Sequence, residues 1–169
     1  MNGDDDITLD PAQRSEMPLL ANLLELYQYD LSEWFAVDVG SEGRFGYSRL
    51  PLYWSEGEHR FPFLVRSHGI VVGFVFATLG SPASDDPTVY DVAEFFILRR
   101  YRRTGIGKEA AFLLWKRFPG RWYIRVLQRN AAALKFWRAA IVEYGVTDMR
   151  ERSLEQIAGW SVFSFVSAE

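Results

Sequence analysis

The chain has no cysteine and only two histidines among its 169 residues. Without cysteine it can form no disulfide, no thiolate-bound zinc site and no cysteine nucleophile. The two histidines, His59 and His68, are too few and too poorly placed for a histidine-rich metal site, so we expect no metal. The lack of cysteine also favours a reducing compartment, and we expect a cytoplasmic protein.

Long hydrophobic runs and a strong charge imbalance are also missing. No apolar run reaches the roughly 20 residues that a membrane-spanning helix needs. The first residues, Asn2 to Asp6, are acidic and polar, unlike the basic start of a signal peptide. A net charge of −3 gives no support to nucleic-acid binding. We therefore expect neither a membrane nor a nucleic acid as a partner.

What is present is an apolar content of 49%, enough for a buried core in one domain that spans residues 1–169. Hydrophobic periodicity predicts helices over about 10–31, 105–118 and 131–140, with Asp10 as N-cap and Pro11 at the first helical position. Pro18 is expected to divide the first of these regions into a turn and a helix. Strands are predicted over 7–9, 61–66, 70–79, 88–98, 122–127, 142–151 and 160–166. This order predicts an α/β or α+β fold, a sheet flanked by helices.

The segment from Glu94 to Lys108 carries the chemistry, because a predicted strand there ends in a basic, glycine-containing loop that opens into a helix. The first turn of a helix has free N–H groups and a partial positive charge, so anions bind there. Gly105 and Gly107 let a phosphate approach the backbone without a Cβ clash. Cationic side chains surround this point: Arg99, Arg100, Arg102, Arg103 and Lys108. The arrangement suits a pyrophosphate group.

The spacing Arg102-x-x-Gly105-x-Gly107 resembles the pyrophosphate-binding signature of the GNAT N-acetyltransferases, which bind coenzyme A. A second GNAT-like pattern follows the next predicted strand: Asn130, Ala133, Phe136 and Trp137. Together the two patterns and their elements cover about residues 89–140. The loop is not a P-loop, since the Gly-Lys-Ser/Thr spacing is missing, and it has too few glycines for a dinucleotide fingerprint.

The resemblance implies a mixed, largely antiparallel sheet of about six or seven strands, splayed between the fourth and fifth, with helices on both faces. It also implies acetyl-CoA as co-substrate and transfer of the acetyl group to a primary amine by direct attack in a ternary complex. The pantetheine arm would lie between the splayed strands. The residues expected to bind the cofactor are Phe96, Ile97, Leu98, Arg102, Arg103, Thr104, Gly105, Ile106, Gly107, Lys108, Asn130, Phe136 and Trp137.

Such a reaction needs a group that takes a proton from the amine, and Glu94 and Asp91 are the candidates. They are three residues apart, so they face opposite sides of an ideal strand unless a bulge intervenes. We favour Glu94, which lies closer to the expected thioester; simple pairing of Glu94 with an arginine is the alternative. Trp137 occupies the position where many family members have a tyrosine acid. We expect Trp137 to pack beside the cofactor, and the general acid stays unassigned.

The acceptor site is expected among the first helix and the aromatic segment 32–57, at Tyr29, Asp30, Trp34 and Tyr53. Acidic groups beside aromatic rings suit a cationic amine, so the predicted acceptor is a small amine, an amino acid or a peptide N-terminus. Ordinary solvated surface charges are the alternative interpretation of these acids.

Two other functions remain open at this point. One is a GNAT-like domain that binds acyl-CoA without catalysis, as a sensor or an interaction module, which Trp137 favours. The other is a nucleotide-binding domain that uses the glycine loop for ATP. The alternating pattern over 160–166 could pair within the sheet or across a homodimer.

Overall fold

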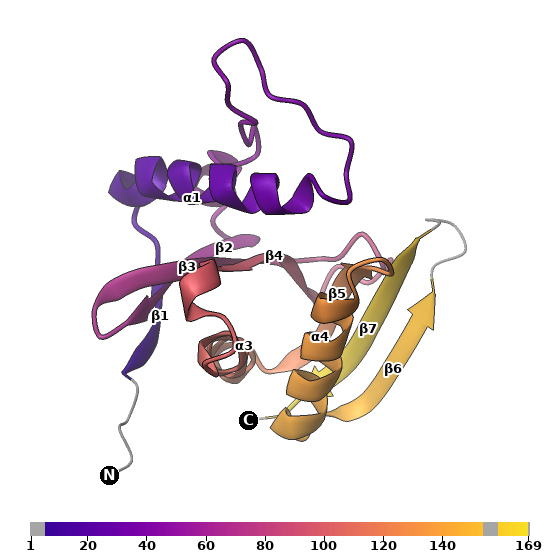
Figure 1. Ribbon diagram of the computed structural model, residues 1–169. Helices are drawn as coiled ribbons and strands as arrows, with labels where there is room; N and C mark the ends of the chain where they lie inside the picture. Colours follow the sequence, from indigo (N-terminus) through magenta and orange to yellow (C-terminus); the bar gives the residue numbers. More distant parts are fainter. Residues whose placement is uncertain (1–5, 154–158, 169) are drawn as a thin grey trace.

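In the computed structural model, which describes residues 6–153 and 159–168, seven strands form one sheet (Figure 1). The order across the sheet is β1-β2-β3-β4-β5-β7-β6. Every neighbouring pair is antiparallel except β4 and β5, which are parallel. The predicted mixed, largely antiparallel sheet is thus confirmed. The strands are β1 (Ile7–Pro11), β2 (Arg60–Ser67), β3 (Ile70–Leu79), β4 (Tyr90–Ile97), β5 (Gly120–Leu127), β6 (Thr147–Ser153) and β7 (Trp160–Ser167).

Helices cover both faces of the sheet, as predicted. On one face α1 (Met17–Leu31) and α2 (Leu52–Ser55) share a core with Phe74 and Phe76 of β3. On the other, α3 (Ile106–Arg117) and α4 (Ala131–Tyr144) share a core with Trp122 and Phe163 (Figure 1). Two 3₁₀ turns, η1 (Arg14–Glu16) and η2 (Arg99–Tyr101), precede α1 and α3. None of the described helices has the length and apolar character needed to cross a bilayer.

The predicted helix start at Asp10 and Pro11 is wrong, because both residues belong to β1. Pro11 lies opposite Phe63 of β2, and Asp10 accepts a hydrogen bond from Thr8 Oγ1 at 2.9 Å. Since β1 is an edge strand, the missing N–H of a proline is tolerated there. Pro18 lies in the first turn of α1, directly after η1, so the predicted division into a turn and a helix is confirmed.

The strand predicted over 142–151 begins later than expected, because α4 continues to Tyr144. The ring of Tyr144 packs edge-on against Trp115 of α3, with centroids 5.3 Å apart, so the contact between α3 and α4 extends to the end of α4. Gly145 then ends the helix in the left-handed conformation, with φ of 80°. The segment from Val142 to Tyr144 is therefore helix, and β6 starts at Thr147.

The splay between β4 and β5 is also confirmed. Their parallel register joins Tyr90–Val92 to Trp122–Ile124 and ends there. Beyond Val92 the two strands part, and we call the resulting gap the V. The remainder of β4 keeps its pairing with β3 on the other side.

Candidate active site

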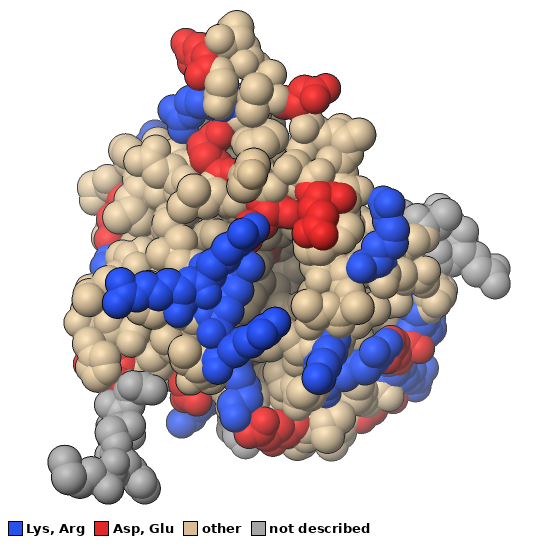
Figure 2. Space-filling view, viewed as in Figure 1, with Lys and Arg blue, Asp and Glu red and all other residues tan. Residues whose placement is uncertain are grey.

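A pocket of about 570 Å³ opens at the V, lined by side chains from α1, the 32–51 segment, α2, β4, β5 and α4. Strand β4 contributes Val92, Ala93, Glu94 and Phe95 to its wall. Figure 2 shows a hollow on the face where α3 begins, with Lys and Arg side chains gathered around it. The exposed arginines of that loop are Arg99, Arg100, Arg102 and Arg103.

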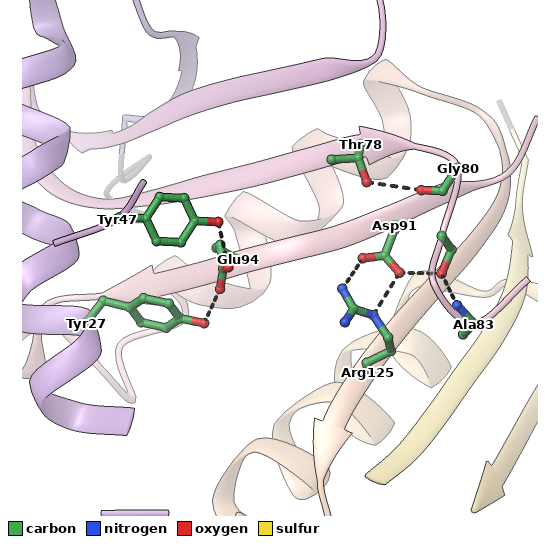
Figure 3. A network of polar contacts seen from close by, with 9 residues as sticks. Tyr27, Tyr47, Thr78, Gly80, Ala83, Asp91, Glu94 and Arg125 are labelled. Atoms are coloured by element: carbon green, nitrogen blue, oxygen red, sulfur yellow. Dashed lines mark hydrogen bonds and ion pairs between the residues drawn. The ribbon is translucent and has the colours of Figure 1, made fainter. Parts of the chain in front are cut away.

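A β-bulge in β4 decides how its two carboxylates face. Ala77 of β3 pairs with Val92 and Phe76 pairs with Glu94, so Ala93 is the extra residue of the bulge. A bulge reverses the side-chain alternation beyond it. Asp91 and Glu94 therefore point to the same face of the sheet and lie near each other along β4 (Figure 3).

Glu94 is held by two phenols that come from distant parts of the chain. The Tyr27 hydroxyl, from α1, donates to Glu94 Oε2 at 2.6 Å, and the Tyr47 hydroxyl donates to Oε1 at 2.9 Å (Figure 3). Both tyrosines line the pocket beside Glu94. These contacts fix the orientation of the carboxylate while leaving it in reach of the cavity.

The electrostatics of this group favour a proton acceptor. Burial raises the pKa of Glu94 above its usual value of 4.5, and the nearby charge of Asp91 adds to this. The hydrogen bonds from Tyr27 and Tyr47 and the charge of Arg125 lower the pKa but do not cancel the effect of burial. A carboxylate whose pKa is raised toward neutrality is a better general base than an exposed one.

Asp91 has a different environment, although it is the other candidate base. Its side chain is 0% exposed, and its two oxygens bind Arg125 of β5, with the shorter contact 2.8 Å from Arg125 Nη2. The Ser81 hydroxyl also donates to Asp91 Oδ2 at 2.5 Å. This ion pair joins β4 to β5 at the point where the V begins (Figure 3). The contacts of Asp91 thus indicate a structural role and favour Glu94 as the base.

The glycine loop has the geometry of an anion site. Arg103 has φ of 61° and Gly105 φ of 92°, so the chain turns sharply into α3. A Cβ at Gly105 would meet no atom within 4 Å, which leaves its surroundings open. The first turn of a helix has free N–H groups, so the start of α3 can bind an anion. The Thr104 hydroxyl donates to the Tyr101 carbonyl at 2.7 Å and holds the loop from behind.

Main-chain pairing shows which part of β4 faces the V. The Leu98 N–H donates to the Val72 carbonyl at 2.9 Å, so Leu98 and, by alternation, Phe96 direct their main-chain groups toward β3. The main-chain groups of Phe95 and Ile97 face the V. The Ile97 carbonyl accepts a hydrogen bond from Arg102 Nε at 2.7 Å. Phe95, which sequence reasoning missed, therefore presents backbone groups for strand addition, whereas Phe96 and Leu98 do not.

Helix α4 forms the wall opposite β4. Its N-cap, Asn130, accepts a hydrogen bond from the Ala133 N–H at 3.0 Å and lines the pocket. Trp137 also lines the pocket and packs edge-on against Phe95 and Phe136, with centroids 4.9 and 4.8 Å away. Trp137 therefore packs against rings of β4 and α4, and its contact with the cofactor stays a prediction.

Two further residues at the start of α3, Gly107 and Lys108, lie at the contact between α3 and α4. A Cβ at Gly107 would lie 3.4 Å from the Phe136 ring, which is an ordinary van der Waals contact. The ammonium of Lys108 binds Glu143 of α4 at 2.7 Å, on the outer side of the contact. Gly107 therefore lies at the contact between α3 and α4.

Of the expected acceptor residues, only Tyr53 lines the pocket. Asp30 instead binds Arg99 and Arg102 and ties the end of α1 to the glycine loop. Burial opposes ionisation of Asp30, but these two arginines lower its pKa overall. Tyr29 is 66% exposed, and neither it nor Trp34 belongs to the pocket lining among the described residues.

The residues that do surround Glu94 on the acceptor side had no local signature. Tyr27 and Tyr47 lie 67 and 47 positions from Glu94 in sequence. Tyr53 packs on Phe76, 4.2 Å between centroids, and burial raises its pKa to about 12. The aromatic content of segment 32–57 indicates a binding element, but the particular contacts depend on tertiary folding.

A CoA-type ligand fits these observations. The open space at Gly105, the cationic rim and the main-chain groups of Phe95 and Ile97 provide partners for a diphosphate and for amides. A family model described as the acetyltransferase (GNAT) family matches residues 23–140. The chain belongs to the GNAT acetyltransferase family. This assignment favours coenzyme A over ATP as the ligand of the glycine loop.

Solved GNAT structures share the fold of this chain. Spermidine N-acetyltransferase from Vibrio cholerae, solved with CoA and spermine, is 14% identical, with 97% of each chain covered and a TM-score of 0.68. An acetyltransferase from Thermus thermophilus is 18% identical, with 95% of each chain covered and a TM-score of 0.63. The PaiA N-acetyltransferase from Thermoplasma acidophilum, solved with coenzyme A, is 10% identical, with 94% of this chain and 98% of that chain covered and a TM-score of 0.60. No curated protein sequence matches the chain.

Proposed function

We propose that this GNAT protein transfers an acetyl group from acetyl-CoA to a primary amine, with Glu94 as the general base. The observation that carries the proposal is the position of Glu94, at the mouth of the V and on the pocket wall, where among the described residues its hydrogen-bond donors are two phenols. Family membership supports the acyl transfer, and the pocket supports the base.

The proton-accepting role follows from the state of the groups around Glu94. An alkyl amine has a pKa near 10.4, so it enters mostly as an ammonium that must lose one proton before it can act as a nucleophile. The ionised Glu94 attracts this cation and accepts a proton from it. Burial and the adjacent carboxylate raise the pKa of Tyr47 and Tyr27, so both phenols stay neutral and keep donating to Glu94.

The cofactor side of the V would hold acetyl-CoA, which supplies the acetyl group as a thioester. The N–H groups of the first turn of α3, with Arg100 and Arg103 at the rim, would bind the diphosphate. Phe95 and Ile97 would pair with the amides of the pantetheine arm. Asn130 and Trp137 form the facing wall, so the ligand lies between β4 and α4.

Acetyl transfer by the wild type and Glu94→Gln tests the proposal. Glutamine keeps the shape of the side chain but accepts no proton at neutral pH. We expect kcat/KM for a primary amine to fall about 100-fold or more. Glu42→Gln, an exposed acid outside the pocket lining, is the matched control and should stay within about twofold. A folded Glu94→Gln enzyme with nearly wild-type kcat/KM would rule out Glu94 as the base.

Calorimetry with acetyl-CoA, CoA and ATP separates the remaining alternatives. We expect heat from both CoA ligands and weaker binding of ATP. A non-catalytic acyl-CoA module, which the tryptophan at 137 favours, would bind acetyl-CoA but transfer nothing to any amine. Tight binding of ATP with no response to CoA would contradict the proposed function.

A further inference from the structure

The charged side chains of the pocket divide into pairs and two unpaired groups. Among the described residues, the Asp, Glu, Lys and Arg side chains that line it are Arg49, Glu56, Arg60, Glu94 and Arg125. Arg60 binds Glu56 at 2.6 Å, and Arg125 binds the buried Asp91. Each of these pairs is electrically neutral as a unit. What remains of the formal charge is one carboxylate, Glu94, and one guanidinium, Arg49.

Arg49 is available to a ligand. Within the described ranges 6–153 and 159–168, Arg49 makes no ion pair and no side-chain hydrogen bond. The residue is exposed and lines the pocket. Its backbone is fixed, since the Arg49 carbonyl accepts from the Leu52 N–H at 3.0 Å at the start of α2. A free guanidinium on a fixed backbone is suited to bind a carboxylate with two parallel hydrogen bonds.

The two unpaired charges line the same pocket. Tyr47, whose hydroxyl touches Glu94, is two residues before Arg49 in the same turn, in which the Leu50 N–H donates to the Tyr47 carbonyl at 3.1 Å. Two residues of chain separate the Cα atoms of Tyr47 and Arg49 by at most about 7 Å, so both side chains start from neighbouring points of the pocket wall. Leu31 and Phe35 add apolar surface to the same cavity. The pocket therefore offers a negative group, a positive group and an apolar wall to a single ligand.

We propose that the amine acceptor also carries a carboxylate, with its ammonium at Glu94 and its carboxylate at Arg49. This inference rests on the proposed acetyl transfer and names the class of acceptor, a small amino acid. Opposite charges at the two ends of the ligand complement the two unpaired groups. A diamine would place its second cation beside Arg49, which is unfavourable, so the same residue discriminates against polyamines.

Matched acceptors test this directly. Wild-type acetylation is measured with glycine, β-alanine and 4-aminobutanoate, with the corresponding amides, which lack the negative charge, and with 1,4-diaminobutane. We expect at least one carboxylate to exceed its own amide by about tenfold or more in kcat/KM, chiefly through KM, and to exceed the diamine by more. Arg49→Gln should bring the ratio of carboxylate to amide close to one. Arg152→Gln, which removes an exposed arginine on β6 outside the pocket lining, should keep the wild-type ratio.

Each outcome decides the inference. If the amides or the diamine are acetylated as well as the carboxylates, acetyl transfer stands and the inference about the acceptor is overturned. The same holds if the wild type prefers carboxylates but Arg49→Gln keeps the full preference. If the wild type binds acetyl-CoA and acetylates no amine at all, the proposed function fails, and this inference fails with it.

Discussion

The surroundings of Asp91 and of Glu94 differ sharply, although both carboxylates lie on β4 and face the same side of the sheet. Asp91 is fully enclosed and meets a cation, Arg125, whereas Glu94 borders a cavity and meets two phenols. An ion pair with good geometry supplies a buried carboxylate with both hydrogen bonds and a counter-charge. Phenols satisfy hydrogen bonds without supplying a counter-charge. Burial alone therefore does not identify a catalytic carboxylate; the charge of its partners does.

Removing the paired carboxylate should have the largest effect on the fold. Asp91→Ala leaves Arg125 at the start of the V without its partner, and breaking a buried pair in this way costs roughly 3–5 kcal/mol. For a chain of this size that corresponds to a fall in Tm of the order of 10 °C. Thermal unfolding measures it, with the exposed Asp85→Ala as control. A loss below about 1 kcal/mol would mean that the pair does not hold β4 to β5.

Removing a phenol should act on the other carboxylate through its pKa. Tyr47→Phe deletes a hydrogen bond that lowers the pKa of Glu94, so the pKa rises further. The acid limb of kcat/KM should move to higher pH by roughly one pH unit, as expected for the loss of a hydrogen bond to a charged group. Tyr29→Phe, on an exposed face of α1, is the control. An unmoved limb would show that the phenol does not tune Glu94.

Glu94→Gln should change the stability of the fold only slightly. Asp91→Ala is expected to lower the stability, whereas Glu94→Gln should leave it equal or slightly higher. Because the folded-state pKa of Glu94 is raised, the wild type is stabilised below the unfolded value and loses that stability as pH rises through the folded pKa. Glu94→Gln carries no such titration. Its Tm should therefore equal or slightly exceed the wild-type Tm at about pH 8, and the difference should shrink toward about pH 4. A variant that is clearly less stable under the alkaline condition would contradict the assigned pKa shift.

The proposed cofactor-binding segments could be singled out from the sequence because each is contiguous. The segment from Glu94 to Lys108 and the pattern after Asn130 each place their residues through one strand, one loop and one helix start. The acceptor side could not be predicted in this way. Tyr27, Tyr47 and Glu94 meet only after α1 and the 32–51 segment fold over β4.

The contacts of Asp30 and the orientation of Phe95 could not be predicted from the sequence. An acid beside aromatic residues predicts an acceptor role for Asp30, but Arg99 and Arg102 bind it from across the fold. No local pattern marks Phe95, because the pairing that faces it toward the V depends on the register with β3. The bulge at Ala93, which gives Asp91 and Glu94 a common face, also arises from that register.

The pH dependence of kcat/KM for acetyl transfer, compared between the wild type and Glu94→Gln, tests the role of Glu94 most directly. A rising limb with a midpoint above pH 4.5, the ordinary value for glutamate, is expected in the wild type and should be absent from the residual activity of the variant. The same limb in both enzymes would show that another group takes the proton from the amine.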